Sequence, residues 1–476
     1  MERLPTGIDG LDAVLRGGFI AGRSYMLHGP AGAGKTIVGL HFLDACEADE
    51  TGLFVNLEED IDDLRANAAA LGFDTDAVEF LDLSPGAEVF TEDQSYEVFS
   101  ASEIEQEPLT EQVTEAVRAT EPDRVVVDPL TQFRYVIDDD YQFRKQIVGF
   151  MRFLKRQGAT VLFTVQETDD LPTDDLQFIS DGYVSLAVAG DRREVRVPKF
   201  RGSATRSGDH AFRITDDGIE VYPALIPERH ERSFAVETLS SGIDEVDDLL
   251  YGGLERGTVT VVSGPTGVGK TTLGTQFARE AARRDDQSIV YLFEESRETY
   301  LARSEAIGLP VGEMIDAGLL RLEEVEPLAL SPQEFASAVR DDVAAGTEMV
   351  MIDGLAGYRL LVRDEDDLLR RLHALGRYLR NVGATTILVD ETTDVVGQFR
   401  ATEREVSYLA DTVVFLRHLE LRGELRKAIG VLKKRASDYE RTLREFAITG
   451  DGIEVGEPLT DLRGVLSGTP EFVDEE

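Results

Sequence analysis

The chain has 476 residues, of which 42% are hydrophobic, and its 49 basic and 91 acidic residues give a formal net charge of −42. This length predicts two or more domains with their own cores, and this composition excludes a generally disordered chain. A polyanionic surface also repels DNA and RNA phosphates, which argues against a nucleic-acid partner.

No apolar run approaches the ~18 residues of a membrane span, and the first residues lack a signal segment, which predicts a cytoplasmic protein without a membrane partner. The single cysteine, Cys46, excludes an internal disulfide, and the six histidines lack zinc-ligand spacing. Acidic residues spread over the whole chain are typical of a halophilic protein, in which solubility in a salty cytoplasm sets the charge.

Apolar runs rich in Val, Ile and Phe alternate along the chain with helical patterns. In the first half, strands are expected at Ser24–Gly29, Leu53–Leu57, Arg124–Asp128, Thr160–Val165, Tyr183–Val188 and Val195–Phe200, and helices at Lys35–Glu47, Ile61–Leu71, Leu109–Ala119 and Tyr141–Gln157. In the second half, strands are expected at Val259–Gly264, Ile289–Phe293, Glu348–Asp353, Thr385–Val389, Thr412–Leu416 and Arg426–Lys433. This alternation predicts the α/β class, with a mainly parallel, doubly wound sheet and a late β extension in each half.

The two halves repeat one another. Leu4–Thr36 and Leu239–Thr271 are identical at 15 of 33 positions without a gap. A repeat of this length is a whole domain rather than a solenoid unit. We therefore expect domain 1 at residues 1–225, a linker with two prolines at 226–236, and domain 2 at 237–476.

Each copy carries the pattern G-x-x-x-x-G-K-[ST] between an expected strand and an expected helix. The glycines allow backbone N–H groups to bond phosphate oxygens, the Lys neutralises the outer phosphates, and the Thr hydroxyl ligates Mg²⁺. An ordinary glycine-rich turn would not need Lys followed by Thr. The expected nucleotide-binding residues are Gly29, Gly32, Ala33, Gly34, Lys35 and Thr36 in domain 1, and Gly264, Gly267, Val268, Gly269, Lys270 and Thr271 in domain 2.

A carboxylate ends a strongly apolar strand in each copy, at Asp128 and Asp353. Ligands of doubly wound sheets bind at the carboxyl ends of the strands, where these carboxylates can orient water on Mg²⁺. We expect Asp128 to act with Thr36, and Asp353 with Thr271, as the metal-binding residues. Alone, either Asp could simply cap the following turn.

Paired glutamates end another apolar strand in each copy, as Glu58-Glu59 and Glu294-Glu295. A carboxylate on this rim can accept a proton from an attacking water or hydroxyl. A single pair in so acidic a chain would usually be solvated surface charge. Recurrence at matching offsets favours the catalytic role, and the sequence leaves open which Glu of each pair is the base.

Basic residues recur on the late strands, as Lys199 with Arg201 and Lys433 with Arg435. Cations so far along the chain from their own phosphate loops can reach the nucleotide of a neighbouring subunit and stabilise charge on the transferring phosphoryl group. The residues alone fit equally well with surface cations that balance an acidic field.

Taken together, the pattern L-x-x-G-I-D-x-x-D-x-x-L-x-G-G-x-x-x-G, the phosphate loop, E-E and K-x-R resemble the KaiC family of RecA-superfamily ATPases. The resemblance covers nearly the whole chain. It is strongest in the second copy, at Phe293-Glu-Glu-Ser-Arg297, Glu420-Leu-Arg-Gly-Glu424, Arg444-Glu-Phe-Ala-Ile448 and Ser467-Gly-Thr-Pro470.

The resemblance implies tandem RecA-like P-loop domains in six-membered double rings, with ATP and Mg²⁺ between subunits. It implies ATP hydrolysis in domain 1 and serine/threonine autophosphorylation in domain 2, with the Glu pairs as bases and Lys199, Arg201, Lys433 and Arg435 acting in trans. A regulatory protein is the implied partner besides the chain itself.

The adjacent Ser-Thr phosphoacceptors of the family correspond to Ser407-Tyr408, so Ser407 is the phosphoacceptor candidate. Thr402 is a nearby hydroxyl that also aligns and is the alternative, transient acceptor site. A plain polar helix or loop residue is the alternative for Ser407. Leu176-Gln177 precede Asp181 in the first copy, so no acceptor is expected there. Because the chain ends soon after Ser467-Gly-Thr-Pro470, where clock members carry a longer tail that binds a stimulating partner, we do not expect clock timekeeping.

Two other functions stay open. An ATP-assembled regulatory scaffold with little catalysis would carry the same phosphate loops. A RecA-like DNA recombinase shares the ATPase core, but it should show basic DNA-binding loops and usually has one core per chain, whereas this chain is acidic and has two.

Overall fold

The computed structural model describes residues 1–75, 78–84, 106–136, 140–166, 174–226, 237–362, 365–392, 406–421, 423–464 and 471–472. Contacts divide the chain into two compact units, Met1–Ala224 and Leu225–Glu476. We call them domain 1 and domain 2 and describe each by itself. The expected linker lies outside the described residues from position 227 onward, as do Thr402 and the motif at 467–470.

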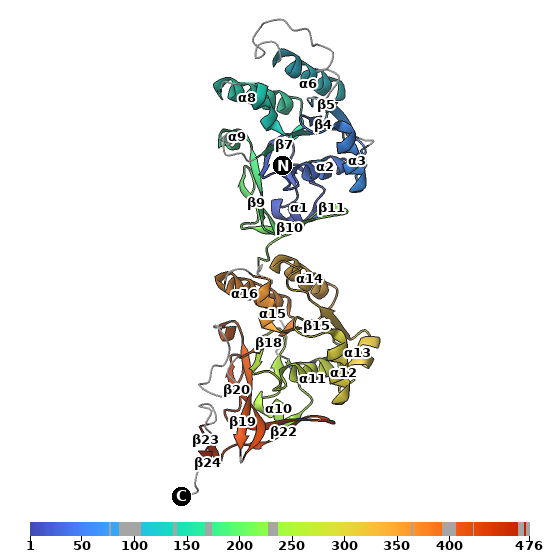
Figure 1. The fold of residues 1–476 in the computed structure, drawn as a ribbon. Coiled ribbons are helices and arrows are strands. Elements are labelled where there is room, and N and C mark those ends of the chain that lie inside the picture. The colour runs from blue at the N-terminus through green and yellow to red at the C-terminus, as the bar shows by residue number, and fades with distance from the viewer. Residues whose placement is uncertain are drawn as a thin grey trace. The chain divides into compact units, whose positions relative to one another are not determined.

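Domain 1 alternates strands and helices (Figure 1). Its strands are β1 (Arg3–Leu4), β2 (Phe19–Ile20), β3 (Ser24–Gly29), β4 (Gly52–Asn56), β5 (Val78–Asp82), β6 (Arg124–Asp128), β7 (Thr160–Gln166), β8 (Gly182–Ala189), β9 (Arg192–Phe200), β10 (His210–Thr215) and β11 (Gly218–Tyr222). Its helices are α1 (Asp9–Leu15), α2 (Lys35–Asp44), α3 (Ile61–Ala70), α6 (Gln106–Thr120), α7 (Phe133–Val136), α8 (Asp140–Arg156) and α9 (Asp174–Ile179), with a 3₁₀ turn at Leu130–Gln132.

Nine of the described strands of domain 1 form one sheet, in the order β11-β10-β9-β8-β3-β7-β6-β4-β5. Neighbours from β8 to β5 are parallel, and neighbours from β8 to β11 are antiparallel. In the parallel part, β3, β4 and β6 are buried along their whole length. Strands covered on both faces are mainly apolar, which explains the nearly continuous apolar runs in the sequence.

Helices cover both faces of this sheet. Val38 and Phe42 of α2 pack with Val126 of β6 in one hydrophobic cluster. Phe143 and Leu154 of α8 pack in a second cluster, which contains the neighbouring residues of β6. Because successive strand residues point to opposite faces, the two clusters are the cores above and below the sheet.

Domain 2 repeats this plan. Its strands are β12 (Thr238–Leu239), β13 (Leu254–Glu255), β14 (Val259–Gly264), β15 (Ser288–Leu292), β16 (Leu320–Glu324), β17 (Met349–Asp353), β18 (Thr385–Glu391), β19 (Thr412–Leu421), β20 (Glu424–Lys434), β21 (Arg444–Thr449), β22 (Gly452–Pro458), β23 (Leu462–Arg463) and β24 (Glu471–Phe472). Its helices are α10 (Asp244–Leu249), α11 (Lys270–Ala282), α12 (Arg297–Ala306), α13 (Val311–Asp316), α14 (Pro332–Ala344), α15 (Leu355–Leu360) and α16 (Glu365–Val382), with a 3₁₀ turn at Val406–Tyr408.

The described strands of domain 2 form a nine-stranded sheet in the order β16-β15-β17-β18-β14-β19-β20-β21-β22, which is the strand order of domain 1 read from the other edge. Phe277 of α11 belongs to the core on one face, and Phe335 of α14 and Leu375 of α16 belong to the core on the other. α14 begins with a capping box, in which Ser331 and Glu334 each bond the other's backbone N–H.

The expected α/β class, the mainly parallel sheets and the late β extensions are confirmed. The ends of the expected elements differ by a few residues from those found, as for the helix expected at Lys35–Glu47, which ends at Asp44. The edge strands β5 and β16 were not expected, because they mix charged with apolar residues and are partly exposed. The outer strands of the β extensions, β10, β11, β21 and β22, were not expected either. None of the described helices combines the length and the apolar character that a bilayer crossing requires.

Candidate nucleotide sites

The phosphate loops connect β3 to α2 and β14 to α11, as the sequence predicts. Gly34 and Gly269 are the N-caps of these helices and adopt φ of 94° and 115°, which residues with a Cβ rarely tolerate. A Cβ at Gly32 or Gly267 would meet no heavy atom within 4 Å, so each loop opens onto free space. The side chains of Ala33 and Val268 are fully buried, so only their backbones can face a phosphate.

The loop lysines point back along their own loops. Lys35 Nζ donates to the carbonyl oxygens of Gly29 (2.9 Å) and Pro30 (2.8 Å). Lys270 Nζ donates to the carbonyl of Pro265 at 2.9 Å and lies 3.8 Å from Glu391 Oε2 at the end of β18. Burial lowers the pKa of both ammonium groups, although nearby carboxylates oppose this effect.

The strand-end aspartates lie beside these loops. Thr271 Oγ1 donates to Asp353 Oδ1 at 3.0 Å, and the carboxylate of Asp128 accepts hydrogen bonds from Thr164 and Thr36. Burial raises the pKa of Asp128, and burial together with the charge of Glu295 raises the pKa of Asp353 to about 7.

These hydroxyl and carboxylate oxygens are the hard ligands that Mg²⁺ prefers, and they adjoin the open phosphate loops. No group of three or more His, Cys, Asp and Glu side chains that could hold a metal occurs in the described part of the chain. The residues therefore fit a Mg²⁺ ion that phosphate oxygens and water also ligate, rather than one held in an all-protein cage.

The glutamate pairs follow strands that are neighbours of the Asp-bearing strands. β4 lies beside β6, and the N–H of Leu57 donates to the carbonyl of Asp128 at 2.9 Å. β15 lies beside β17, and the N–H of Phe293 donates to the carbonyl of Asp353 at 3.0 Å. Each Glu pair therefore begins at the residue directly after the one whose N–H bonds the strand-end Asp.

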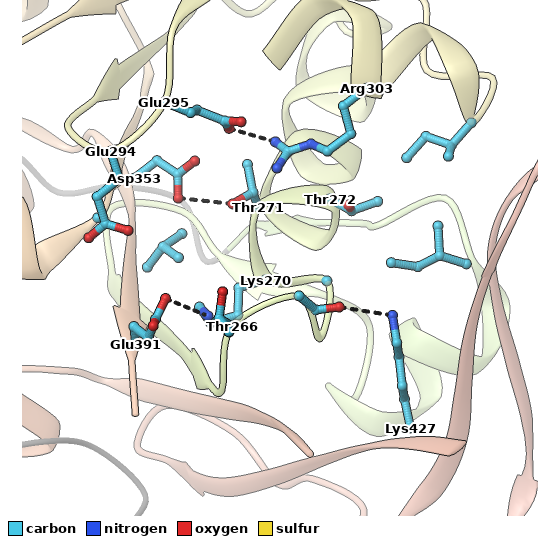
Figure 2. Close-up of a pocket in the computed structure, with 16 residues that line it drawn as sticks. Thr266, Lys270, Thr271, Thr272, Glu294, Glu295, Arg303, Asp353, Glu391 and Lys427 are labelled. Carbon is cyan, nitrogen blue, oxygen red and sulfur yellow. Dashed lines mark hydrogen bonds and ion pairs between the residues drawn. The ribbon is translucent and has the colours of Figure 1, made fainter. Parts of the chain in front are cut away.

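In domain 2 these groups border a cavity of about 490 Å³, a size typical of small-ligand sites. Figure 2 shows Lys270, Thr271, Glu294, Glu295 and Asp353 around it. The cavity is lined by Thr266, Gly267, Gly269, Lys270, Thr271, Thr272, Glu294, Glu295, Arg303, Ile307, Asp353, Gly354, Val389, Glu391, Lys427 and Ile448.

The two glutamates of domain 2 are held differently. Glu295 Oε1 pairs with Arg303 Nη2 of α12 at 2.7 Å. Glu294 lies against Gly354, where a Cβ would be only 2.8 Å from Glu294 Cδ. The glycine after Asp353 therefore leaves room for the carboxylate of Glu294 beside the strand-end Asp (Figure 2).

Nine lining residues were not predicted as site residues. Two lie away from every predicted motif and strand, namely Arg303 and Ile307, and seven lie in or within two residues of one, namely Thr266, Thr272, Gly354, Val389, Glu391, Lys427 and Ile448. Lys427 on β20 donates from Nζ to the carbonyl of Gly267 at 3.1 Å. In domain 1, Arg193 on β9 donates to the carbonyl of Gly32 at 2.8 Å. Both cations stand six residues before the Lys of K-x-R, so a comparison of the two copies could have found them. Arg303 and Ile307 give no local signal.

The K-x-R cations bond carbonyls of their own chain. Lys433 Nζ donates to the carbonyls of Ser407 (2.9 Å) and Ala410 (2.7 Å), and Arg435 Nη2 donates to that of Tyr408 at 3.3 Å. In domain 1, Lys199 donates to the carbonyls of residues 177, 178 and 180, and Arg201 to that of 178. Neither Lys433 nor Arg435 lines the cavity of domain 2.

The structure corrects the alignment of the acceptor region. Asp181 and Asp411 occupy the same place, because each N–H bonds the carbonyl of the first residue of the phosphate-loop strand and each carboxylate faces the K-x-R arginine. Ser407 lies four residues before Asp411, and Gln177 lies four residues before Asp181, so Gln177-Phe178 correspond to Ser407-Tyr408. The correspondence with Leu176-Gln177 was therefore wrong by one residue. Domain 1 still has no hydroxyl at these positions.

The KaiC ATPase family model matches residues 4–226 and 239–460. The chain belongs to the KaiC family of ATPases. It is 29% identical to the circadian clock oscillator protein KaiC of Parasynechococcus marenigrum over 495 aligned positions, which cover 99% of this chain and 94% of the relative. Proteins of the same name from a strain of Prochlorococcus marinus (29% over 498 positions, 100% and 96% covered) and from Thermostichus vulcanus (28% over 492, 99% and 92%) are also similar.

Both domains of this KaiC-family chain contain a complete phosphate loop, so the family match implies ATP as the nucleotide of both sites. The alignments with these clock proteins span both copies of the repeat in this chain.

Proposed function

We propose that both domains bind Mg²⁺-ATP at their phosphate loops and hydrolyse it, and that the chain acts as a signalling or regulatory ATPase. Residues 1–225 and 237–476 are the two functional units. The observation that carries the proposal is the domain 2 cavity, which brings the loop Lys270, the bonded pair Thr271 and Asp353, and Glu294 to one space.

The chemistry follows from these positions. The backbone of the loop and Lys270 bind the phosphates, and bound Mg²⁺ supplies positive charge that offsets the charge developing on the phosphoryl oxygens. A glutamate takes the proton of the attacking water, whose oxygen bonds the γ-phosphorus while the bond to the β–γ bridging oxygen breaks and ADP leaves. Domain 1 offers Lys35, Thr36, Asp128 and its Glu pair for the same steps.

The K-x-R cations complete the sites in trans, in a six-membered ring. Lys433 and Arg435 are absent from the lining of their own cavity, and their side chains bond carbonyls of the segment 407–410, which precedes β19. Cations held away from their own nucleotide in this way can be presented to the nucleotide of a neighbouring protomer, where they stabilise charge on the transferring phosphoryl group.

Domain 2 also phosphorylates itself at Ser407. The serine lies in the 3₁₀ turn Val406–Tyr408, and Lys433 and Arg435 donate hydrogen bonds to carbonyls of this turn. When these cations reach the nucleotide of a neighbouring protomer, the hydroxyl of Ser407 therefore comes close to the same nucleotide. Domain 1 has Gln177-Phe178 at this place and only hydrolyses ATP.

The catalytic proposal predicts that purified protein converts ATP to ADP with Mg²⁺ and that Lys35→Ala plus Lys270→Ala lowers the rate at least about a hundredfold, since each Lys carries charge that the phosphates require. Colorimetric phosphate release measures this. Full activity in the double variant would contradict the assignment. If nucleotide only drives ring assembly and the Glu pairs can be neutralised without loss of rings or signalling, the chain is an ATP-assembled scaffold.

The autokinase part is tested by mass spectrometry after incubation with Mg²⁺-ATP. We expect phosphate on Ser407, and its loss in Ser407→Ala and in Lys270→Ala. Lys35→Ala serves as the control that keeps the domain 2 loop intact. If phosphate is absent from Ser407 in the unmutated chain under conditions where ATP is hydrolysed, domain 2 is an ATPase alone.

A further inference from the structure

Arg303 distinguishes the two glutamates of the domain 2 pair, because it forms an ion pair with Glu295 and not with Glu294. It is the seventh residue of α12, lines the cavity, and pairs from Nη2 with Glu295 Oε1 at 2.7 Å. Figure 2 shows the two side chains turned toward one another, while Glu294 lies beside Asp353. Glu295 thus forms a close ion pair with a cation, whereas Glu294 forms no ion pair among the described residues and interacts with Lys270 only through longer-range charge attraction.

A polar network extends from Arg303 to the phosphate-loop helix. The Arg303 guanidinium lies 5.5 Å from the centroid of the Tyr300 ring, and the Tyr300 hydroxyl bonds Thr275 Oγ1 at 2.6 Å. Thr275 in turn donates to the carbonyl of Thr271 at 2.8 Å. Tyr300 and Thr275 are fully buried, so this network fixes α12, and with it Arg303, against the helix that carries the phosphate loop.

Domain 1 lacks the three side chains that make this network. α3 and α12 both have ten residues, and Leu64 and Asn67 of α3 stand where Tyr300 and Arg303 stand in α12. Leu40, the sixth residue of α2, occupies the place of Thr275 in α11. Burial raises the pKa of Glu59, and the negative charges of Asp128, Glu58 and Asp63 raise it further. The two ATPase sites of one chain therefore differ at the Glu pair.

We propose that Arg303 is a positioning residue that withholds Glu295 from the reaction, so that Glu294 alone accepts the proton in domain 2, whereas in domain 1 both Glu58 and Glu59 are available. This inference rests on the proposed ATPase function. The pair is partly exposed, with 39% of the Arg303 side chain and 19% of the Glu295 side chain accessible, so it contributes little to stability and acts mainly through geometry.

The test is a suppression experiment on full-length protein carrying Lys35→Ala, in which only domain 2 hydrolyses ATP. Loss of a general base costs roughly 10²–10⁴-fold in rate, so Glu294→Gln should lower kcat at least about a hundredfold. Adding Arg303→Asn should release Glu295 and raise kcat about tenfold or more above Glu294→Gln alone. Arg303→Lys in the same background keeps the charge and should give no such recovery.

A matched control is Arg283→Asn in the Glu294→Gln background, because Arg283 also forms a 2.7 Å pair with a glutamate of domain 2 but lies outside the cavity lining. It should leave kcat unchanged. Recovery of activity cannot come from damage to the fold. The inference is overturned if Glu294→Gln keeps the parent rate, if Arg303→Asn fails to restore activity, or if Arg283→Asn restores it equally.

The reciprocal experiment uses Lys270→Ala, in which only domain 1 hydrolyses ATP. Glu58→Gln and Glu59→Gln should each keep at least about a tenth of the parent kcat, because the other glutamate substitutes. Adding Asn67→Arg to Glu58→Gln should then lower kcat about tenfold further, and adding it to Glu59→Gln should not. Equal effects in both backgrounds would overturn the inference. Absence of ATP hydrolysis in both parents would instead contradict the proposed function.

Discussion

At the scale of single residues, burial of the strand-end aspartates disfavours their charged form and so costs folding free energy. Asp353 is 7% exposed, and burial together with the charge of Glu295 raises its pKa from 3.8 to about 7. Thr271 and Arg303 act in the opposite direction but do not cancel these effects. A buried carboxylate with a raised pKa is typical of a functional site, which agrees with the metal-binding role proposed for Asp353.

The pKa of Asp353 predicts how the stability of the metal-free, nucleotide-free protein depends on pH. Between about pH 4 and pH 7 the folded state keeps a proton that the unfolded state has lost, so stability falls as the pH rises through this range and stays low above it. Asp353→Asn removes the charge and should raise the free energy of unfolding by about 2 kcal/mol more at pH 8 than at pH 5.

Thermal unfolding followed by circular dichroism at the two pH values measures this difference. Asp316→Asn, at an exposed position of the same domain, is the control and should change the midpoint equally at both. A midpoint for Asp353→Asn that lies above that of the parent by the same amount at pH 5 and pH 8 would show that the carboxylate is not destabilised in the fold.

At the scale of elements, the β extension reaches back over the phosphate loop. β19 and β20 form the long hairpin next to β14, and Lys427 near the start of β20 bonds the carbonyl of Gly267. β9 supplies Arg193 to Gly32 in the same manner. The hairpin thus supports the loop and places a cation at the mouth of the site.

This contact predicts a role for Lys427 in nucleotide binding. Lys427→Ala removes both the bond to the loop and a positive charge that lines the cavity, so the Kd for ATP in a Lys35→Ala background should rise about five- to tenfold, equivalent to roughly 1 kcal/mol. Titration with a fluorescent ATP analogue measures it. Arg426→Ala, next along the strand and paired with Glu424 and Glu445, should leave the Kd unchanged. An equal rise in both variants would mean that overall charge, not this contact, is responsible.

At the scale of the whole molecule, two domains of one topology carry different core chemistry. The first residue of β6 is Arg124, fully buried and paired with Glu50 at 2.6 Å, whereas the first residue of β17 is Met349. Conversely, Glu255 and Lys434 form a buried pair at 2.8 Å in domain 2. The topology therefore depends on the pattern of burial and tolerates an ion pair wherever a partner satisfies it.

The charge of −42 also acts on the molecule as a whole. Like charges on one surface repel over a Debye length of about 10 Å at 0.1 M salt and about 3 Å at 1 M. We therefore expect the thermal unfolding midpoint to rise by several degrees between 0.1 M and 2 M KCl. Sucrose at matched osmolality is the control for solute exclusion and should give a smaller rise. A midpoint that is constant or falls with KCl would contradict the halophilic interpretation.

The sequence by itself determined the parts of this protein that are encoded by contiguous residues. The phosphate loops, the apolar strands that end at Asp128 and Asp353, and the Glu pairs are each a short contiguous segment with a residue pattern that can be recognised without knowing what it contacts in space. Because every segment occurs twice, the repeat also predicted that both domains share one plan, including the β extension of each.

Only the tertiary structure decided which glutamate of the domain 2 pair forms an ion pair with Arg303 and which other residues line the cavity. Arg303 in α12 and Ile307 at its C-cap, Lys427 in β20 and Ile448 in β21 line the same cavity as Lys270, because α12 and the β extension pack around the phosphate loop. A contact of this kind depends on the geometry of the whole sheet, so no local pattern indicates it. The same reason explains why Arg303 and Asn67 look alike in sequence, as polar residues on a helix, although one engages a glutamate and the other stands on an exposed face.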